Sequence, residues 1–467
     1  MRLDRCVPID MKTIKVHFLG AAGTVTGSKF LLETPQINIL IDCGMFQGLK
    51  ELRSKNWDYL PVDVSTIDVV LLTHGHLDHT GYLPRLVKQG FRGKIVGTAP
   101  TLAITEIILK DSAKIHEEEA ERANKLGYSS HKPAKPFYTV KEAEATLEFF
   151  RSEEIDKWTQ LNDDVKCRFK YNGHIIGATF IELDIFGKIF VFSGDIGRQN
   201  DLLLYPPQQP KWADYLFIES TYGNKLHPTE SVSEKLVELI KEIIHNRGNL
   251  IIPSFAVERL QTLMFILWKL YNENRIPNIP IFVDSPMGNN VLSVFERFSD
   301  WHKLPPRDFK AMSNRMHLIT SYKETWETID NPQPKVVIAG SGMVTGGRVL
   351  TYLQQLIDEA TTAVLLVGYQ AEGTRGRQLL EGAHELKFFG KYHSVKAQIH
   401  HIESLSAHAD QQGILDWTSN IRNVPEKVFL IHGEPSAQDA LRLKLQDIRK
   451  WSVQIPKLYD IVEINLQ

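Results

Sequence analysis

Cysteines and long apolar segments are both scarce in this sequence. Its 467 residues include three cysteines at wide spacing, Cys6, Cys43 and Cys167. An odd, scattered set does not supply the disulfide framework of a secreted domain, and it is typical of a reducing compartment. No run of about 18 apolar residues occurs, and the beginning of the chain has no apolar segment of signal-peptide length. We therefore expect a cytoplasmic protein that does not contact a membrane.

An excess of charge of either sign is also missing. The 54 Lys and Arg residues nearly balance the 56 Asp and Glu residues, which leaves a formal net charge of −2. No global positive field therefore attracts nucleic acid, and a polyanionic substrate has to be held by a local site. The glycine-rich loops match neither the Walker nor the dinucleotide-binding pattern, so we expect no nucleotide cofactor.

What the sequence does contain is a histidine-rich turn behind a predicted buried strand. The apolar residues 69–72 predict the strand, and the turn that follows holds three imidazoles and one carboxylate within six positions. These ligand types suit Zn²⁺ or a similar cation, and a tight turn lets their side chains converge. Chance rarely produces this string in a chain with 17 histidines, which disfavours the alternative of a merely polar loop. The predicted metal ligands are His74, His76, Asp78 and His79.

The same pattern recurs along the chain, because several other short apolar runs end at a single metal-competent side chain beside glycine or serine. Glycine allows close approach of the backbone while its neighbour points into a common site. Each such residue is by itself equally compatible with a turn cap. Together with the histidine-rich turn they could fill most of two coordination spheres. The candidates are Asp42, His174, Asp195, Glu219, His408 and His432, whereas we expect His116, His131, His400 and His401 not to bind metal.

From about residue 231 the pattern changes to helices that alternate with short apolar runs. This alternation predicts a second α/β domain with a mostly parallel sheet. Three of its strand ends lead into loops rich in glycine, serine and arginine, at residues 284–288, 340–348 and 368–377. Such loops can hold a phosphate, although tight turns with surface arginines are the alternative. The predicted phosphate-binding residues are Ser341, Gly342, Arg348, Arg375 and Arg377.

With these positions in place, nearly the whole chain resembles the β-CASP group of the metallo-β-lactamase superfamily, which includes RNA-processing nucleases. The resemblance implies an α/β fold in which a β-CASP domain with a parallel sheet interrupts an αββα sandwich. The expected segments are residues 1–220 and 396–467 for the lactamase domain and residues 221–395 for the insertion. Because the chain starts almost at the first predicted strand and ends with this fold, we expect no appended RNA-binding domain.

The resemblance further implies a ligand set for two Zn²⁺ ions, with Mn²⁺ as the alternative metal. One ion would take His74, His76, His174 and Asp195, and the other Asp78, His79, Asp195 and His432. Asp42 and Glu219 would hold imidazoles in the required tautomer, and His408 would transfer a proton to the leaving ribose oxygen. We count His408, Glu219, Asp195 and Asp42 as the candidate catalytic residues.

The function expected from this resemblance is hydrolysis of RNA phosphodiester bonds in a cleft between the two domains. The alternatives are a DNA nuclease of the same group, a hydrolase of thioesters or lactams, and a non-catalytic scaffold. A histidine at position 432 favours RNA within the family, the inserted domain disfavours a small substrate, and the intact ligand set disfavours a scaffold. The sequence does not distinguish endonuclease from 5′-exonuclease action. It also leaves open whether the protein forms a homodimer.

Overall fold

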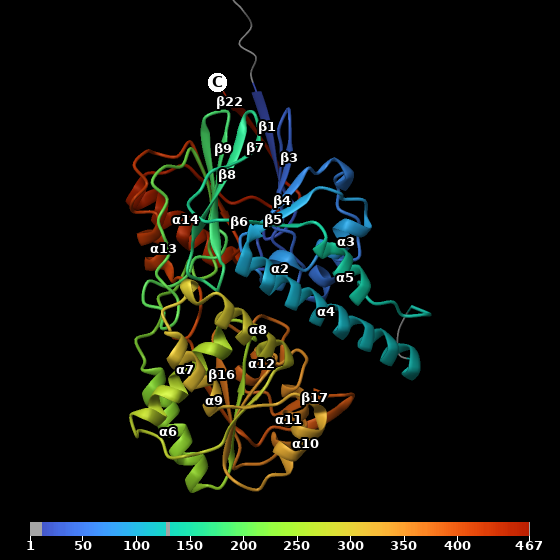
Figure 1. Cartoon of the computed structure of the whole chain (residues 1–467), viewed down its shortest axis with the longest axis vertical. Coiled ribbons are helices and arrows are strands. Elements are labelled where there is room, and N and C mark those ends of the chain that lie inside the picture. Colours follow the sequence, from blue (N-terminus) through green and yellow to red (C-terminus); the bar gives the residue numbers. More distant parts are fainter. Residues whose placement is uncertain (1–11, 128–130, 467) are drawn as a thin grey trace, which may run out of the picture.

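The computed structural model describes residues 12–127 and 131–466, which form two stacked domains (Figure 1). The upper domain in this view is a sandwich of two seven-stranded sheets. The first sheet has the strand order β22 (Ile461–Leu466), β1 (Lys12–Phe18), β2 (Phe30–Glu33), β3 (Asn38–Ile41), β4 (Val69–Leu71), β5 (Lys94–Thr98), β6 (Phe150–Glu153). The second has the order β21 (Val453–Gln454), β20 (Lys427–Ile431), β11 (Tyr215–Glu219), β10 (Lys188–Phe192), β9 (Thr179–Ile185), β8 (Val165–Tyr171), β7 (Thr159–Asn162).

Aromatic side chains fill the space between the two sheets of this sandwich. The ring of Phe217 stacks on Phe192 and Phe429 from the neighbouring strands, with centroids 4.1 and 4.7 Å apart. Phe18 and Phe30 reach them from the opposite sheet. Alternation of side chains along each strand directs these residues to one face, so the interior is dry and closely packed.

Helices cover the outer faces of both sheets, which gives the expected αββα order of layers. The first sheet is covered by α3 (Leu83–Lys88), α4 (Ala99–Leu126) and α5 (Val140–Leu147), and the short helices α1 (Lys50–Lys55) and α2 (Leu77–Thr80) lie in its connections. The second is covered by α13 (Gln411–Trp417) and α14 (Pro435–Arg449), with Trp417 fully buried beneath them. The far end of the long helix α4 extends away from the body in Figure 1.

The lower domain is a six-stranded parallel sheet between two layers of helices, as the alternating pattern predicted. Its strand order is β14 (His317–Leu318), β13 (Ile281–Asp284), β15 (Lys335–Ala339), β12 (Asn249–Pro253), β16 (Ala363–Val367), β19 (Gln398–Ile402). Its helices are α6 (Val232–His245), α7 (Arg259–Asn272), α8 (Pro286–Arg297), α9 (Pro306–Arg315), α10 (Tyr322–Asp330), α11 (Val349–Leu356) and α12 (Arg375–Leu380). A hairpin of β17 (Glu385–Phe388) and β18 (Lys391–Ser394) is attached to it.

The structure corrects one domain assignment made from the sequence. The strand around residues 398–402 was expected in the lactamase part, but β19 pairs in parallel with β16 throughout its length. The local apolar pattern does not specify the sheet that the strand joins, and pairing with β16 adds five residue pairs to the parallel ladder of the inserted domain. The chain therefore returns to the sandwich only after Ile402. His400 and His401 lie on β19, which agrees with the expectation that they are structural.

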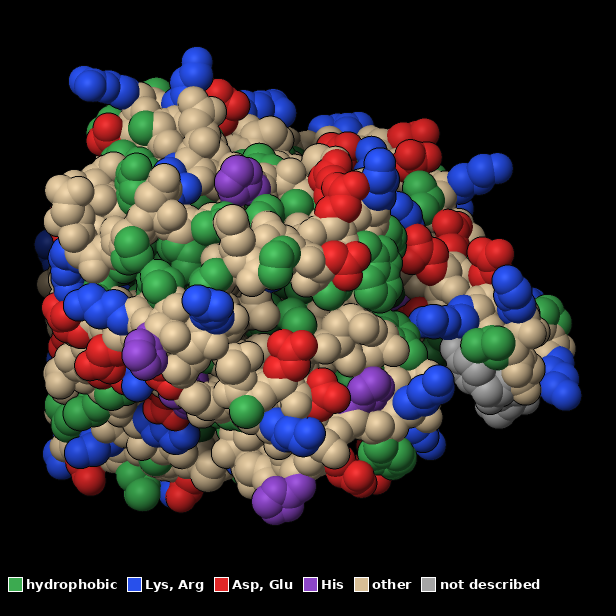
Figure 2. Space-filling view, turned by 90° about the horizontal axis from the view of Figure 1, so that it is seen from below, with side chains coloured by type: hydrophobic (Ala, Val, Ile, Leu, Met, Phe, Trp, Pro, Cys, Tyr) green, Lys and Arg blue, Asp and Glu red, His purple; other side chains and the backbone are tan. Residues whose placement is uncertain are grey.

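Surface charges are interspersed, as the balanced composition implies. Figure 2 looks at the molecule from the end formed by the inserted domain and shows Lys and Arg side chains among Asp and Glu over this face. No helix within the described ranges combines the length and apolar character needed to span a bilayer.

Glu258 marks the junction of the two domains, directly before α7. Its backbone is left-handed, with φ of 68°, and its side chain is 2% exposed. The carboxyl group accepts a hydrogen bond of 2.6 Å from the Thr262 hydroxyl. Burial, with a contribution from nearby Asp201, raises the pKa of Glu258 to about 8.

This raised pKa predicts a pH-dependent stability. Because the folded pKa lies above the unfolded value, the stabilisation is complete below pH of about 4.5 and is lost as the pH rises through 8. Glu258→Gln removes this dependence. The unfolding free energy of the variant, relative to that of the wild type, should therefore be higher at pH 8 than at pH 5 by about 3 kcal/mol. Denaturant unfolding at both values measures the difference, and exposed Glu296→Gln is the control. An equal difference at both pH values would contradict the prediction.

Candidate metal centre

The ends of adjacent strands bring the predicted ligands together. β10, β11 and β20 are parallel neighbours, so Asp195, Glu219 and His432 come to the same edge of the second sheet. Asp42 follows β3 and faces them from the first sheet. Asp42 and His432 both have left-handed backbones, with φ of 57° and 48°. Such conformations cost free energy and concentrate at functional sites, where they direct a side chain off the end of a strand.

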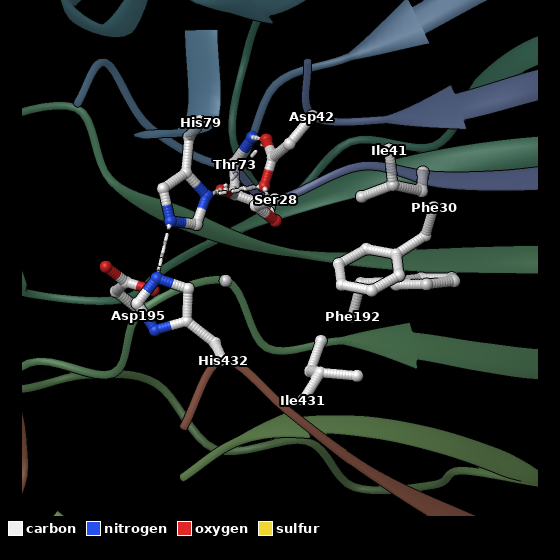
Figure 3. A pocket seen from close by; sticks show the side chains of 11 residues that line it. Ser28, Phe30, Ile41, Asp42, Thr73, His79, Phe192, Asp195, Ile431 and His432 are labelled. Atoms are coloured by element: carbon white, nitrogen blue, oxygen red, sulfur yellow. Dashed lines mark hydrogen bonds and ion pairs between the residues drawn. The ribbon is translucent and has the colours of Figure 1, made fainter. Parts of the chain in front are cut away.

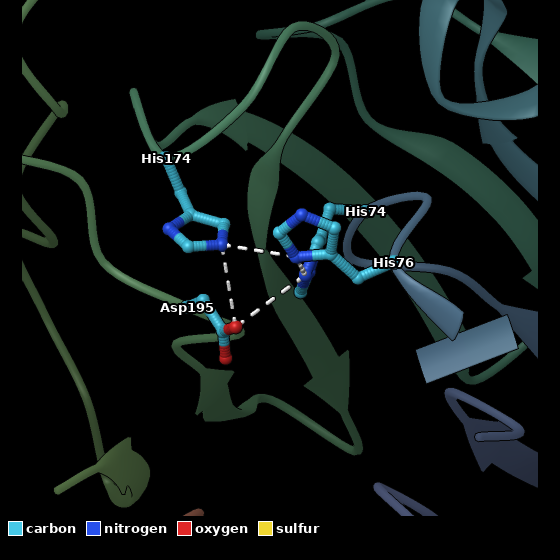
Figure 4. A group of neighbouring side chains, drawn as sticks. All are labelled: His74, His76, His174 and Asp195. Carbon is cyan, nitrogen blue, oxygen red and sulfur yellow. Dashed lines mark hydrogen bonds and ion pairs between the residues drawn. The ribbon is translucent and has the colours of Figure 1, made fainter. Parts of the chain in front are cut away.

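Four side chains form the first ligand group, shown in Figure 4. His76 Nδ1 lies 3.0 Å from His74 Nε2 and 3.2 Å from His174 Nε2. Asp195 Oδ2 lies 3.4 Å from each of the two Nε2 atoms. Burial lowers the pKa of His76 to about 4 and holds the pKa values of His74 and His174 well below the ordinary histidine value. The three rings are therefore neutral and carry the lone pairs that metal binding requires.

The second ligand group lies on the other side of Asp195, and Figure 3 shows most of it. His79 Nε2 and His432 Nε2 are 3.2 Å apart, and Asp78 Oδ2 is 3.4 Å from the latter. Asp195 Oδ1 lies 3.3 Å from His79 Nε2 and 3.6 Å from His432 Nε2. One carboxylate thus presents one oxygen to each group.

This donor set fits two zinc ions. Ligands about 2.1 Å from a tetrahedral Zn²⁺ are separated from one another by about 3.4 Å, and the spacings in both groups are close to this value. Asp195 Oδ1 is buried and accepts no hydrogen bond from any residue that the structure describes. A buried carboxylate oxygen without a donor is costly, and a cation between the two groups would satisfy it.

A surrounding set of hydrogen bonds fixes the orientation of the ligand imidazoles. Asp42 Oδ2 accepts a bond of 2.7 Å from His79 Nδ1, which leaves Nε2 for the metal. The hydroxyls of Thr73 and Thr221 lie 3.1 Å from Nδ1 of His74 and of His432. Such partners set tautomer and ring angle. Sequence reasoning missed both threonines, whose only signal was that each lies within two residues of a predicted site residue.

His408 stands beside the centre and outside both ligand groups. Its Nδ1 lies 3.2 Å from both carboxylate oxygens of Glu219, while its Nε2 points toward Asp195 Oδ2 at 3.9 Å. Burial lowers the pKa of His408, but the carboxylates of Glu219 and Asp195 outweigh it and raise the pKa to about 9. The ring is held rigidly with one nitrogen directed into the site.

The predicted phosphate-binding residues do not gather as one group. Ser341 Oγ accepts hydrogen bonds from the backbone N–H groups of Thr345 and Gly346 within its own loop. Arg375 donates to the backbone oxygens of Lys387 and Val344. Phosphate binding by these loops stays a prediction.

Arg377 and Gly342, two other residues predicted to bind phosphate, also contact neighbouring residues. Arg377 forms an exposed ion pair of 2.7 Å with Glu381, which a phosphate can displace at little cost. Gly342 is packed against Phe255, where a Cβ atom would lie 2.6 Å from the ring, and its carbonyl accepts a hydrogen bond from Gln370.

Arg348 has partners inside the inserted domain, which argues against its predicted contact with phosphate. Its guanidinium is buried, donates a 2.7 Å hydrogen bond to Thr325, and lies 3.5 Å from the centroid of the Tyr322 ring. It also faces the fully buried carboxylate of Asp284 at 3.7 Å. The charge that looked available in the sequence is therefore used to compensate a buried acid inside the inserted domain.

Arg348→Met should consequently lower stability and leave substrate affinity unchanged. Removing one partner of a buried ion pair costs about 3 kcal/mol, because Asp284 keeps only neutral hydrogen-bond donors. Denaturant unfolding and the KM of the folded variant measure the two effects. A raised KM with unaltered stability would restore the phosphate-binding assignment.

Comparison with known proteins places this geometry in a family. Three family models match successive parts of the chain: the metallo-beta-lactamase superfamily over residues 23–241, the Beta-Casp domain over residues 260–379, and the Zn-dependent metallo-hydrolase RNA specificity domain over residues 392–456. The order agrees with the sandwich and its inserted domain.

Full-length relatives extend this agreement. The chain is 33% identical to Ribonuclease TTHA0252 of Thermus thermophilus over 455 residues, which cover 95% of this chain and 99% of that protein. It is 29% identical to the transcription termination factor FttA of Methanocaldococcus jannaschii over 97% of this chain and 72% of that protein. A crystal structure of a protein of unknown function from Enterococcus faecalis V583 shares the fold, with a TM-score of 0.54 at 12% identity over 97% of this chain and 100% of that one. The chain belongs to the β-CASP family of the metallo-β-lactamase superfamily.

Proposed function

We propose that this protein is a metal-dependent ribonuclease that hydrolyses phosphodiester bonds of RNA at a dinuclear centre. The observation that carries the proposal is the bridging position of Asp195, with one oxygen toward each ligand group and His408 directly beside it. RNA is the favoured polymer because the relative that matches almost end to end is named a ribonuclease and one matching model is an RNA specificity domain.

Two zinc ions held by these residues would supply an activated water and offset the charge that develops on the phosphoryl oxygens. The protein residues fix the geometry of that chemistry. Asp195 sets the separation of the two ligand groups, and Asp42 holds His79 with Nε2 directed inward. The closely packed sheets behind them keep the site rigid, so little reorganisation accompanies the reaction.

His408 delivers the proton that the leaving group requires. Glu219 holds its Nδ1–H, and the carboxylates on either side favour the doubly protonated ring. When the bond between phosphorus and the ribose O3′ breaks, the proton on Nε2 passes to O3′. The products are a 3′-hydroxyl end and a 5′-phosphate end, and the positioned imidazole supplies this proton without a separate encounter.

Incubation of the purified protein with end-labelled RNA, end-labelled DNA and a chromogenic lactam, each with and without a chelator, tests the proposal. We expect chelator-sensitive cleavage of RNA alone. Cleavage of DNA, or of the lactam, would replace the proposal with one of the alternatives drawn from the sequence. RNA labelled at either end also separates internal cleavage from stepwise removal at the 5′ end, since only the former gives a ladder from both labels.

A further inference from the structure

Arg259, at the junction of the two domains, is a buried cation with no hydrogen-bond or ion-pair partner among the described residues. It is the first residue of α7, and its side chain is 8% exposed. Its Nε has no hydrogen-bond acceptor, and its guanidinium forms no ion pair or hydrogen bond with the residues of the described ranges. Since burial of an unpaired charge is strongly unfavourable, such a residue indicates an anion that joins it in the working protein.

The guanidinium of Arg259 lies close to the His408 side of the metal centre. Its Nη2 packs against Gly368, where a Cβ atom would be 3.7 Å away. It also interacts electrostatically with Tyr222, whose ring centroid lies 6.2 Å from that of His408. A ligand held here would therefore lie next to the imidazole that faces the leaving group.

A second arginine approaches the same place from the lactamase domain. Arg198 follows Gly197, whose backbone pairs with that of His408, and it donates a hydrogen bond to the backbone oxygen of Ser404. The charges of Arg198 and Arg259 repel each other, which is one reason why the pKa of Arg259 is lowered, after its burial. Two like charges kept together in a folded protein are typical of an anion-binding site.

The neighbouring acids, Asp201 and Glu258, attract Arg259 but offset the charge of the two arginines only in part. The carboxylate of Asp201 is used to accept the backbone N–H groups of Leu203 and Leu204 at 2.8 and 2.7 Å. Glu258, with its pKa of about 8, is mostly protonated at neutral pH. Within the described residues, neither acid comes into ion-pair distance of the two arginines. The site thus keeps a net positive charge.

We propose that Arg259 and Arg198 bind the phosphodiester immediately next to the scissile one, on the side of the leaving ribose. The guanidinium fork matches phosphate oxygens in two parallel hydrogen bonds, and one arginine from each domain would hold the strand across the junction. This inference rests on the proposed ribonuclease function, whose leaving group His408 faces.

Binding without chemistry gives the first test. The chelated, metal-free protein is titrated with single-stranded RNA at several salt concentrations. Each phosphate contact contributes about 0.7 to the slope of log K against log salt for a single strand, so Arg259→Gln should reduce the slope by about 0.7. Arg259→Lys keeps the charge and should keep the slope while weakening binding. Exposed Arg297→Gln on α8 is the matched control and should change neither.

Cleavage of a modified substrate gives the second test. An RNA that carries a neutral methylphosphonate at the linkage on the 5′ side of the scissile bond should lose about tenfold to hundredfold in kcat/KM with the wild type. Arg259→Gln should show the same loss on normal RNA and almost no further loss on the modified RNA, because the partner is already missing. A merely structural role would give independent, multiplying losses and would overturn the inference.

These outcomes separate the inference from the function on which it rests. If the wild type cleaves RNA but Arg259→Gln leaves the salt slope unchanged, the phosphate site is wrong and the ribonuclease stands. If the wild type neither binds nor cleaves RNA, the proposed ribonuclease function is wrong, and the phosphate site that rests on it is wrong as well. If thermal unfolding shows that Arg259→Gln does not fold, both tests are made with Arg259→Lys and Arg198→Gln. An RNA affinity equal to that of the wild type in both variants would then overturn the proposed phosphate site.

Discussion

Asp195→Ala should release both metal ions and abolish cleavage. The variant removes the carboxylate whose two oxygens face the two ligand groups. Each group therefore loses one donor atom, and the negative charge between the groups is lost. We expect elemental analysis to find less than one zinc per chain, against two in the wild type, and cleavage to fall by at least about 10⁴-fold.

The control for this experiment is Asp439→Ala, which removes an exposed carboxylate from α14 and should keep both zinc ions and the wild-type rate. Thermal unfolding of the metal-free proteins verifies that Asp195→Ala is folded. A variant that retains two zinc ions would show that Asp195 does not bridge, and the dinuclear arrangement would have to be rebuilt around the remaining donors.

His408→Ala should keep both metal ions and lose about 10²–10⁴-fold in the rate of bond cleavage. That loss is the usual contribution of a positioned proton donor, and the ring lies outside both ligand groups. The effect should appear in kcat under single-turnover conditions, with KM nearly unchanged, since Glu219 and the metal ligands remain in place.

A substrate with sulfur in place of the leaving O3′ distinguishes proton donation from a structural role. Thiolate leaves without protonation, so His408→Ala should cleave this RNA at nearly the wild-type rate. Loss of zinc in His408→Ala would identify the histidine as a ligand, and an undiminished defect on the sulfur substrate would exclude it as the donor.

The sequence was sufficient to predict that these side chains come together, because they follow buried strands in a regular way. His174, Asp195 and His432 each lie within three positions of the end of an apolar run and beside glycine. This repeated pattern predicted a common site, although each residue alone was equally compatible with a turn cap. The resemblance to β-CASP proteins then divided them into two groups, and the distances between these side chains agree with that division.

The remaining features depend on pairings that no local pattern encodes. Arg348 looked like a free cation because its partner Asp284 lies 64 positions earlier and meets it only after the parallel sheet has formed. The sequence of β19 has the local pattern of an ordinary strand. Only the folded structure shows that this strand pairs with β16 of the inserted domain. Arg259 gave no signal because the absence of a partner is visible only in three dimensions.

The order in which the chain emerges during translation has a consequence for its activity. His408 and His432 are synthesised after the whole inserted domain, and the first sheet is completed when β22 pairs with β1, near the opposite end of the described residues. A polypeptide interrupted anywhere before residue 432 therefore holds at most one complete ligand group and no closed sandwich. Under the proposed ribonuclease function, we expect copies interrupted before residue 432 to be inactive, so the transcript being translated would not be cleaved by its own product before both ligand groups have been synthesised.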